Sequence, residues 1–196
     1  MKKLENLDTK KLVLLALFTA IVILLQLLGS FIKLGPFSIS LVLMPIAVGA
    51  ALIGSLAGAW LGLVFGFVVL ASGDANLFLA INPAATIAVV LLKGVLAGFI
   101  AGLIYKLISG ISKIVASVAT AIACPIINTG VFVIGCYAFF LPDLTQWGEA
   151  FGSPSVTAYI FLGMIGINFL IEAGVNLVLS PTIVRLIQIW QDRKSD

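Results

Sequence analysis

The charge-free stretch from Ser38 to Ser72 most constrains how this chain can fold. A helix crosses the roughly 30 Å of membrane hydrocarbon in about 20 residues, so this stretch is too long for one crossing. The whole chain is 62% hydrophobic and only 10% charged, whereas about a quarter of the residues in soluble domains are charged. The sequence therefore predicts an integral membrane protein in which this stretch forms two spans, divided near "GAALIGSLAG".

Helix-breaking residues and polar loops divide the rest of the apolar sequence. Gly35 and Pro36 interrupt one run, and Asn82 followed by Pro83 is a helix-start signal. We expect an all-α membrane protein, a six-transmembrane-helix bundle that forms a single domain over residues 1–196. The expected spans are about 12–29, 38–53, 56–71, 84–105, 114–140 and 157–180.

The positive charges favour this count. With six spans, every lysine and arginine except Lys33 and Lys93 falls on the side that holds both termini. Cytoplasmic loops carry an excess of Lys and Arg, so both termini are expected to be cytoplasmic. The segments 30–37, 72–83 and 141–156 are then outside. Their aromatic residues, Trp147 among them, either cover a pocket opened from outside or are ordinary interface aromatics, and both interpretations stay open.

Lys93 is the most unusual residue of the apolar sequence. It lies about 15 Å inside the expected fourth span, counted from Pro83. An ionisable side chain at this depth is costly, and it commonly faces a bundle interior or a water-filled cavity that serves function. We expect Lys93 to contact a substrate or to pair with a buried acid, with a purely structural pair as the alternative.

Polar residues on two other spans reach a similar depth. Asn168, Glu172 and Asn176 recur every four residues and so share one helix face. Asn128, on the fifth span, is expected at the level of Lys93 and Asn168, with Glu172 one turn deeper. This layer is a candidate pocket, although hydrogen bonds between helices would also explain it. The candidate substrate-binding residues are Lys93, Asn128, Asn168, Glu172, Asn82 and Trp147.

Small residues also recur at four-residue spacing. Glycines do so in 54–66 and 94–102, and Ala16 and Ala20 form a pair on the first span. Such stripes let helices approach closely, and packing within the bundle explains the glycines adequately. Cys124 and Cys136 lie about 18 Å apart along one helix, so no disulfide between them is expected.

Three absences in the sequence narrow the chemistry. The chain contains no histidine, which removes the commonest general base and the commonest metal ligand. No nucleophile–base pair is evident, so we expect no enzyme and no catalytic residues. No nucleotide-binding G-x-x-x-x-G-K-[ST] motif occurs either. We therefore expect neither a metal nor another cofactor, and any ATP would be used by partner subunits.

Three segments resemble one protein family. "ALFTA", "KLGPFSISLVLMPIAVGAALIGSLAGAWLGLVFG" and "LLKGVLAGFIAGLIYK" are similar to the substrate-binding S components of energy-coupling factor (ECF) vitamin transporters. The resemblance implies a multi-pass protein of a prokaryotic cell membrane that binds one vitamin near its outer face. It also implies docking through Ala16 and Ala20 on a transmembrane coupling protein, which two cytosolic ATPases drive. The expected partners are this ligand, these subunits and the lipid bilayer, with no nucleic acid.

The ligand expected from the residues is a small carboxylate. Lys93 favours an anion, with Glu172 as its partner when the site is empty, and few aromatics are certain to lie over the site. Pantothenate fits best on these grounds, while folate, riboflavin, biotin and another vitamin precursor stay open. A self-sufficient secondary carrier is the alternative class, although the two halves of the chain show no convincing repeat.

Overall fold

A computed structural model describes residues 2–31, 33–34, 37–38, 41–166, 169–175 and 177–178 of the chain. Four long helices dominate it, namely α1 (Lys2–Ser30), α3 (Ser55–Ser72), α5 (Pro83–Ile108) and α6 (Lys113–Phe139). Each contains a stretch that is long and apolar enough to cross a membrane. The expected helical membrane class is therefore confirmed for the described part of the chain.

The expected second span, 38–53, is shorter than predicted. Helix α2 is Leu43–Ile53, and its 11 residues extend only about 16 Å at 1.5 Å per residue. The residues before it include the short strand β2 (Phe37–Ser38), which pairs antiparallel with β1 (Lys33–Leu34). The chain leaves α2 at Gly54, whose φ of 132° and ψ of 172° separate α2 from α3. This glycine lies at the predicted division of the charge-free stretch.

The expected sixth span, 157–180, is not one straight helix. It begins with α8 (Val156–Ala158) and the π-helical segment η1 (Tyr159–Ile165). The chain then bends by 43° into the helix Phe169–Val175. The described residues thus hold four candidate spans, or five if this bent pair counts as one. The count of six spans and the cytoplasmic termini stay predictions.

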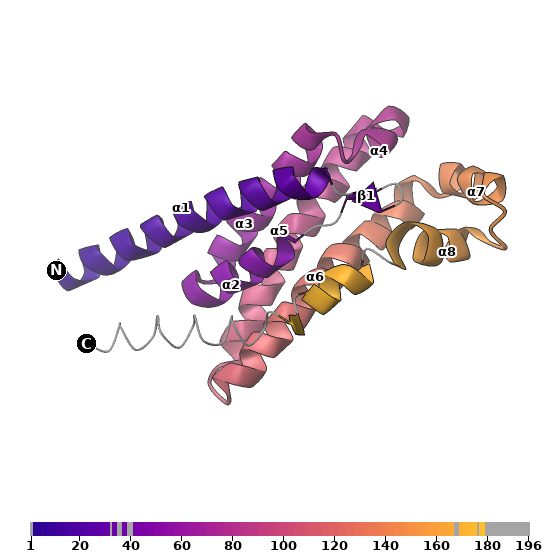
Figure 1. The fold of residues 1–196 in the computed structure, drawn as a ribbon. Helices are drawn as coiled ribbons and strands as arrows, with labels where there is room; N and C mark the ends of the chain where they lie inside the picture. The colour runs from indigo at the N-terminus through magenta and orange to yellow at the C-terminus, as the bar shows by residue number, and fades with distance from the viewer. Residues whose placement is uncertain are drawn as a thin grey trace.

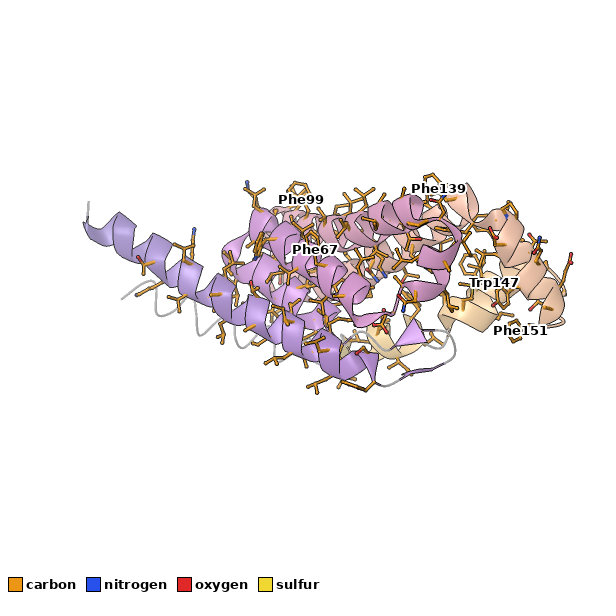
Figure 2. The ribbon with its side chains drawn as sticks, turned by 90° about the horizontal axis from the view of Figure 1, so that it is seen from above. Phe67, Phe99, Phe139, Trp147 and Phe151 are labelled. Carbon is orange, nitrogen blue, oxygen red and sulfur yellow. The ribbon has the colours of Figure 1, made fainter. Side chains whose placement is uncertain are left out.

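The three segments expected outside contain more structure than loops. Besides β1 and β2, they include α4 (Asn76–Ile81) and α7 (Leu141–Ala150). Figure 1 shows β1, α4, α7 and α8 gathered at the end of the bundle opposite the N-terminus of α1. Figure 2 places Trp147 and Phe151 at this same end, with Phe67 and Phe99 on the body of the bundle.

Helices α3 and α5 pack backbone against backbone through the predicted glycine stripes. A Cβ atom added at Gly62 would overlap the carbonyl of Gly94, and one added at Gly58 would overlap the carbonyl of Gly98. The close approach therefore depends on residues without side chains. Packing within the bundle, as the sequence indicated, explains these facing glycines, whereas Gly54 separates α2 from α3.

Two apolar clusters form the core. One joins α1, α2, α3, α5 and the first half of α6, around side chains such as Phe65. The other joins α4, the end of α6, α7 and η1, around side chains such as Phe140. Cys124 and Cys136 are both buried and free, as predicted, and lie one in each cluster.

Candidate substrate-binding cavity

A cavity lies where the two apolar clusters meet, lined by residues from both. Side chains reach it from α1, α3, α4, α5, α6, η1 and the helix Phe169–Val175, so segments far apart in the sequence build one site. Its polar and charged lining residues are Gln26, Asp74, Thr86, Lys93, Asn128, Thr129 and Glu172. Its aromatic lining residues are Phe78, Phe132, Phe140 and Phe169.

Lys93 reaches the cavity from α5, where it precedes Gly94, the glycine that packs against Gly62. Its Nζ lies 5.6 Å from the ring centre of Phe65 on α3 and 5.3 Å from that of Phe132 on α6. Both distances suit a cation over an aromatic face. Glu172, with only 7% of its surface exposed, lines the same cavity.

Gln26 brings α1 into the site. Its side chain is 1% exposed, and its Nε2 donates a hydrogen bond of 2.9 Å to Oδ2 of Asp74. Asp74 follows the left-handed Gly73, which ends α3. The turn after Gly73 therefore places the carboxylate of Asp74 within hydrogen-bonding distance of α1. Sequence reasoning missed both residues, although a single amide within "ILLQLLG" was a visible signal.

Two buried oxygens of the site have no hydrogen-bond partner among the described residues. They are Oε1 of Gln26 and Oδ1 of Asn128, and Asn128 is 6% exposed. An unpaired buried acceptor costs about 1–3 kcal/mol, and native proteins contain few of them. Two such groups on the lining of one cavity indicate a place where donors are supplied from elsewhere.

Aromatic rings close the cavity towards α4 and α7. The ring of Phe78 meets Phe140 edge to face at 4.9 Å between centres and Phe132 at 5.6 Å. Trp147 contacts the same ring at 6.0 Å. These pairs hold Phe78 in place through their preferred edge-to-face geometry. The cavity therefore has an apolar, ring-lined part beside its charged part.

The structure brings together three of the six predicted substrate-binding residues. Lys93, Asn128 and Glu172 all line the cavity, where the helix spacing predicted the first two at one level and Glu172 one turn deeper. Trp147 lies one layer behind, against Phe78. Asn168, like Asn176, lies outside the described residues.

Asn82 has a different place from the one expected. Among the described residues that line the cavity it does not appear. Its Oδ1 instead accepts a hydrogen bond of 3.1 Å from the backbone N–H of Ala85. Asn82 is thus the N-cap of α5, followed by Pro83 in the first turn. The sequence pattern that marked the helix start explains this residue better than ligand contact does.

Ala16 and Ala20 are exposed on α1, as a docking surface requires. Thr19, between them, accepts a hydrogen bond of 3.2 Å from the indole Nε1 of Trp60 on α3. Large apolar side chains on the same helix are exposed as well, among them Leu12, Val13 and Leu17. This surface of α1 therefore meets lipid or another membrane protein.

Comparison with known proteins identifies the fold and the family of the chain. No curated protein matches it. Among solved structures, ThiT from Listeria monocytogenes, determined by native-SAD phasing, superimposes with a TM-score of 0.62 at 19% identity, covering 90% of this chain and 98% of that one. This likeness shows a shared fold. The family model for the substrate-specific component of ECF transporters matches residues 10–184, which is nearly the whole chain. The protein therefore belongs to the family of ECF transporter substrate-specific components.

Proposed function

We propose that this chain captures a vitamin-type molecule in the cavity around Lys93 and delivers it inward with an ECF coupling protein and two cytosolic ATPases. The observation that carries this proposal is the cavity itself. Residues from seven segments converge there on one buried and two half-buried charged side chains and on two unpaired acceptors. Concave sites with an apolar lining and a few convergent polar groups are typical of small-molecule binding.

The ligand that fits this cavity carries a ring. The preference for pantothenate depended on a scarcity of aromatics around the site, and that premise is wrong. Phe78 on α4, Phe132 on α6, Phe140 between α6 and α7, and Phe169 on the helix Phe169–Val175 line the cavity. Of the vitamins considered above, the ring-bearing riboflavin and folate match this lining better than pantothenate does.

We further propose six spans in a prokaryotic cell membrane, with both termini cytoplasmic and the ring-lined end of the cavity outside. Docking on the coupling protein would use the exposed face of α1 that carries Ala16 and Ala20. The small side chains there would let a partner helix approach closely.

Co-purification tests the proposed function. The chain is expressed with an ECF coupling protein and its two ATPases, and a tag on the coupling protein is used to isolate the complex from detergent. We expect this chain to co-elute, and ligand uptake into proteoliposomes to require ATP. Failure to associate, together with uptake that persists without the ATPases, would show a self-sufficient carrier instead.

A further inference from the structure

A surface groove lies at the opposite end of α3 from the cavity around Lys93. The cavity is lined by residues at the end of α3, whereas the groove is lined by its first turns, by α2, by the last turns of α5 and by Leu15 of α1. No described residue lines both. The groove is therefore a separate feature of the molecule.

The wall of the groove is largely apolar and open to its surroundings. Leu15, Leu52, Leu56 and Trp60 belong to it, and Leu56 and Trp60 are 80% and 48% exposed. Helices α1, α3 and α5, which build most of the groove, each contain a candidate membrane span. Large exposed apolar side chains on such a surface mark contact with the membrane or with another apolar surface.

The polar groups of the groove lie towards one end. Lys106 is the one charged side chain among the described residues that line it. A Cβ atom added at Gly102 would overlap Cα of Ser55, so the start of α3 is level with Gly102 and Lys106 lies one turn beyond it. Ser109, which also lines the groove, follows at the end of α5. The groove therefore has an apolar inner part and a cationic outer end.

Helix α1 brings a second lysine to this outer end. The indole N–H of Trp60 donates a hydrogen bond of 3.2 Å to Thr19, which places these two residues at one level. Lys11 lies about 12 Å before Thr19 along α1, and the same rise per residue places Lys106 about 13 Å from Trp60. Lys11 also precedes Leu15 by four residues and so shares its helix face. Two lysines on two helices thus flank the outer end of the groove.

The length of α5 places this outer end at the membrane surface. Its 26 residues extend about 39 Å, which exceeds the roughly 30 Å of membrane hydrocarbon. Lys106 is in its last turn, so its ammonium is expected at the level of the lipid headgroups. Anionic headgroups attract lysines in this position, and the described lining of the groove contains no acidic residue that would oppose them.

We propose that this groove binds an anionic phospholipid, with one acyl chain along Leu15, Leu56 and Trp60 and the phosphate between Lys11 and Lys106. The apolar wall and the flanking lysines match the two parts of such a molecule. The site is separate from the cavity of the proposed function. Ala16 and Ala20 are not among its described lining residues either.

Quenching of Trp60 fluorescence by brominated lipids tests this proposal. The full-length chain has three tryptophans, and the variant Trp147→Phe/Trp190→Phe keeps only Trp60. It is reconstituted into bilayers of phosphatidylglycerol and phosphatidylcholine, with bromine on the acyl chains of one lipid at a time. We expect brominated phosphatidylglycerol to bind beside Trp60 at least roughly fivefold more tightly, the effect of one lysine at an anionic surface. At about 1 M salt, where screening is strong, most of this preference should disappear.

Lys106→Gln in this variant should lower the preference by roughly fivefold. Lys113→Gln is the matched control, because Lys113 begins α6 and no described residue of α6 lines the groove. It removes the same charge and should leave the preference unchanged. The inference is overturned if both lipids quench equally before either lysine is changed, or if the two lysine variants behave alike. It is also overturned if neither lipid quenches, since protein would then cover the groove.

Native mass spectrometry checks the same preference without any substitution. The unaltered chain is released from bilayers that contain equal amounts of the two lipids, and the phospholipid that stays bound is identified. We expect phosphatidylglycerol to predominate among the retained lipids. Equal retention of both lipids, or retention of neither, would also overturn the inference.

Discussion

Nε2 of Gln26 and Oδ2 of Asp74 lie 2.9 Å apart across 48 positions of sequence. Gln26 is on α1, which also carries Ala16 and Ala20, while Asp74 belongs to the turn between α3 and α4. One hydrogen bond therefore ties the helix proposed to dock on the coupling protein to the wall of the proposed binding site. The two ends of this bond are not equally buried, and this difference leads to a prediction.

We expect Asp74→Ala to destabilise the protein more than Gln26→Leu does. Without Asp74, Nε2 of the fully buried Gln26 loses its acceptor, which costs about 1–3 kcal/mol. Without Gln26, water can reach the partly exposed Asp74, and an unpaired Oε1 is removed as well. Thermal unfolding of both variants in one detergent measures the difference, and equal losses would contradict it.

The facing glycines of α3 and α5 should not tolerate a methyl group. Gly62→Ala is expected to destabilise by about 1–3 kcal/mol, because the added Cβ would force two backbones apart. Gly130→Ala is the matched control, since nothing lies within 4 Å of a Cβ added there. In the interior of α6 that change should stabilise by up to about 1 kcal/mol through helix propensity. Unfolding monitored by tryptophan fluorescence compares the two, and a harmless Gly62→Ala would disprove the close contact.

Lys93 and Glu172 should be energetically coupled. Lys93→Met removes a positive charge from the cavity that the buried Glu172 also lines, so it should destabilise more than the double variant Lys93→Met/Glu172→Gln. A double-mutant cycle of unfolding free energies should give a coupling of about 0.5–3 kcal/mol. Equal losses of stability in the single and the double variant would show that the two charges are not coupled.

A bulky residue on the docking face of α1 should prevent assembly. Ala16→Trp is expected to abolish co-elution with the coupling protein while ligand binding is kept. Ile134→Trp is the matched control, because Ile134 is also exposed but lies on α6. Loss of ligand binding in Ala16→Trp would instead indicate a misfolded protein, and equal co-elution of both variants would rule out this face.

Asn82 should affect stability and not binding. Asn82→Ala removes the N-cap of α5 and is expected to cost about 0.5–2 kcal/mol of unfolding free energy. Asn82→Asp keeps a capping acceptor and should recover most of this loss. Calorimetry with the bound ligand should show the same affinity for both variants, whereas a weakened affinity in Asn82→Asp would restore Asn82 to the site.

The sequence allowed the long helices to be predicted because their signals are local. Asn82 and Pro83 begin α5 where the helix-start pattern placed it, and the break at Gly54 lies within the predicted division. Helix spacing alone also predicted Lys93 and Asn128 at one level, with Glu172 one turn deeper, and all three line the cavity. These local signals did not predict the π-helical segment η1 or the bend after it, because both depend on packing against neighbouring helices.

The aromatic part of the cavity was the larger omission. Phenylalanines occur throughout an apolar chain, so nothing local distinguishes Phe78 or Phe140 from exposed phenylalanines such as Phe67. Their role depends on which helices meet, and that is a tertiary property. The polar members Gln26 and Asp74 were missed for a related reason, because their importance comes from a contact between distant segments.

The glycine contact between α3 and α5 has a mechanical consequence. Two backbones in direct contact have no side chains between them that could change rotamer, so this pair can act as a fixed frame. Lys93 is anchored on the frame beside Gly94, whereas Glu172 is carried by the helix beyond the 43° bend. If the cavity widens to admit or release a ligand, η1 and the helix after it would therefore move, while α3 and α5 keep their positions relative to each other.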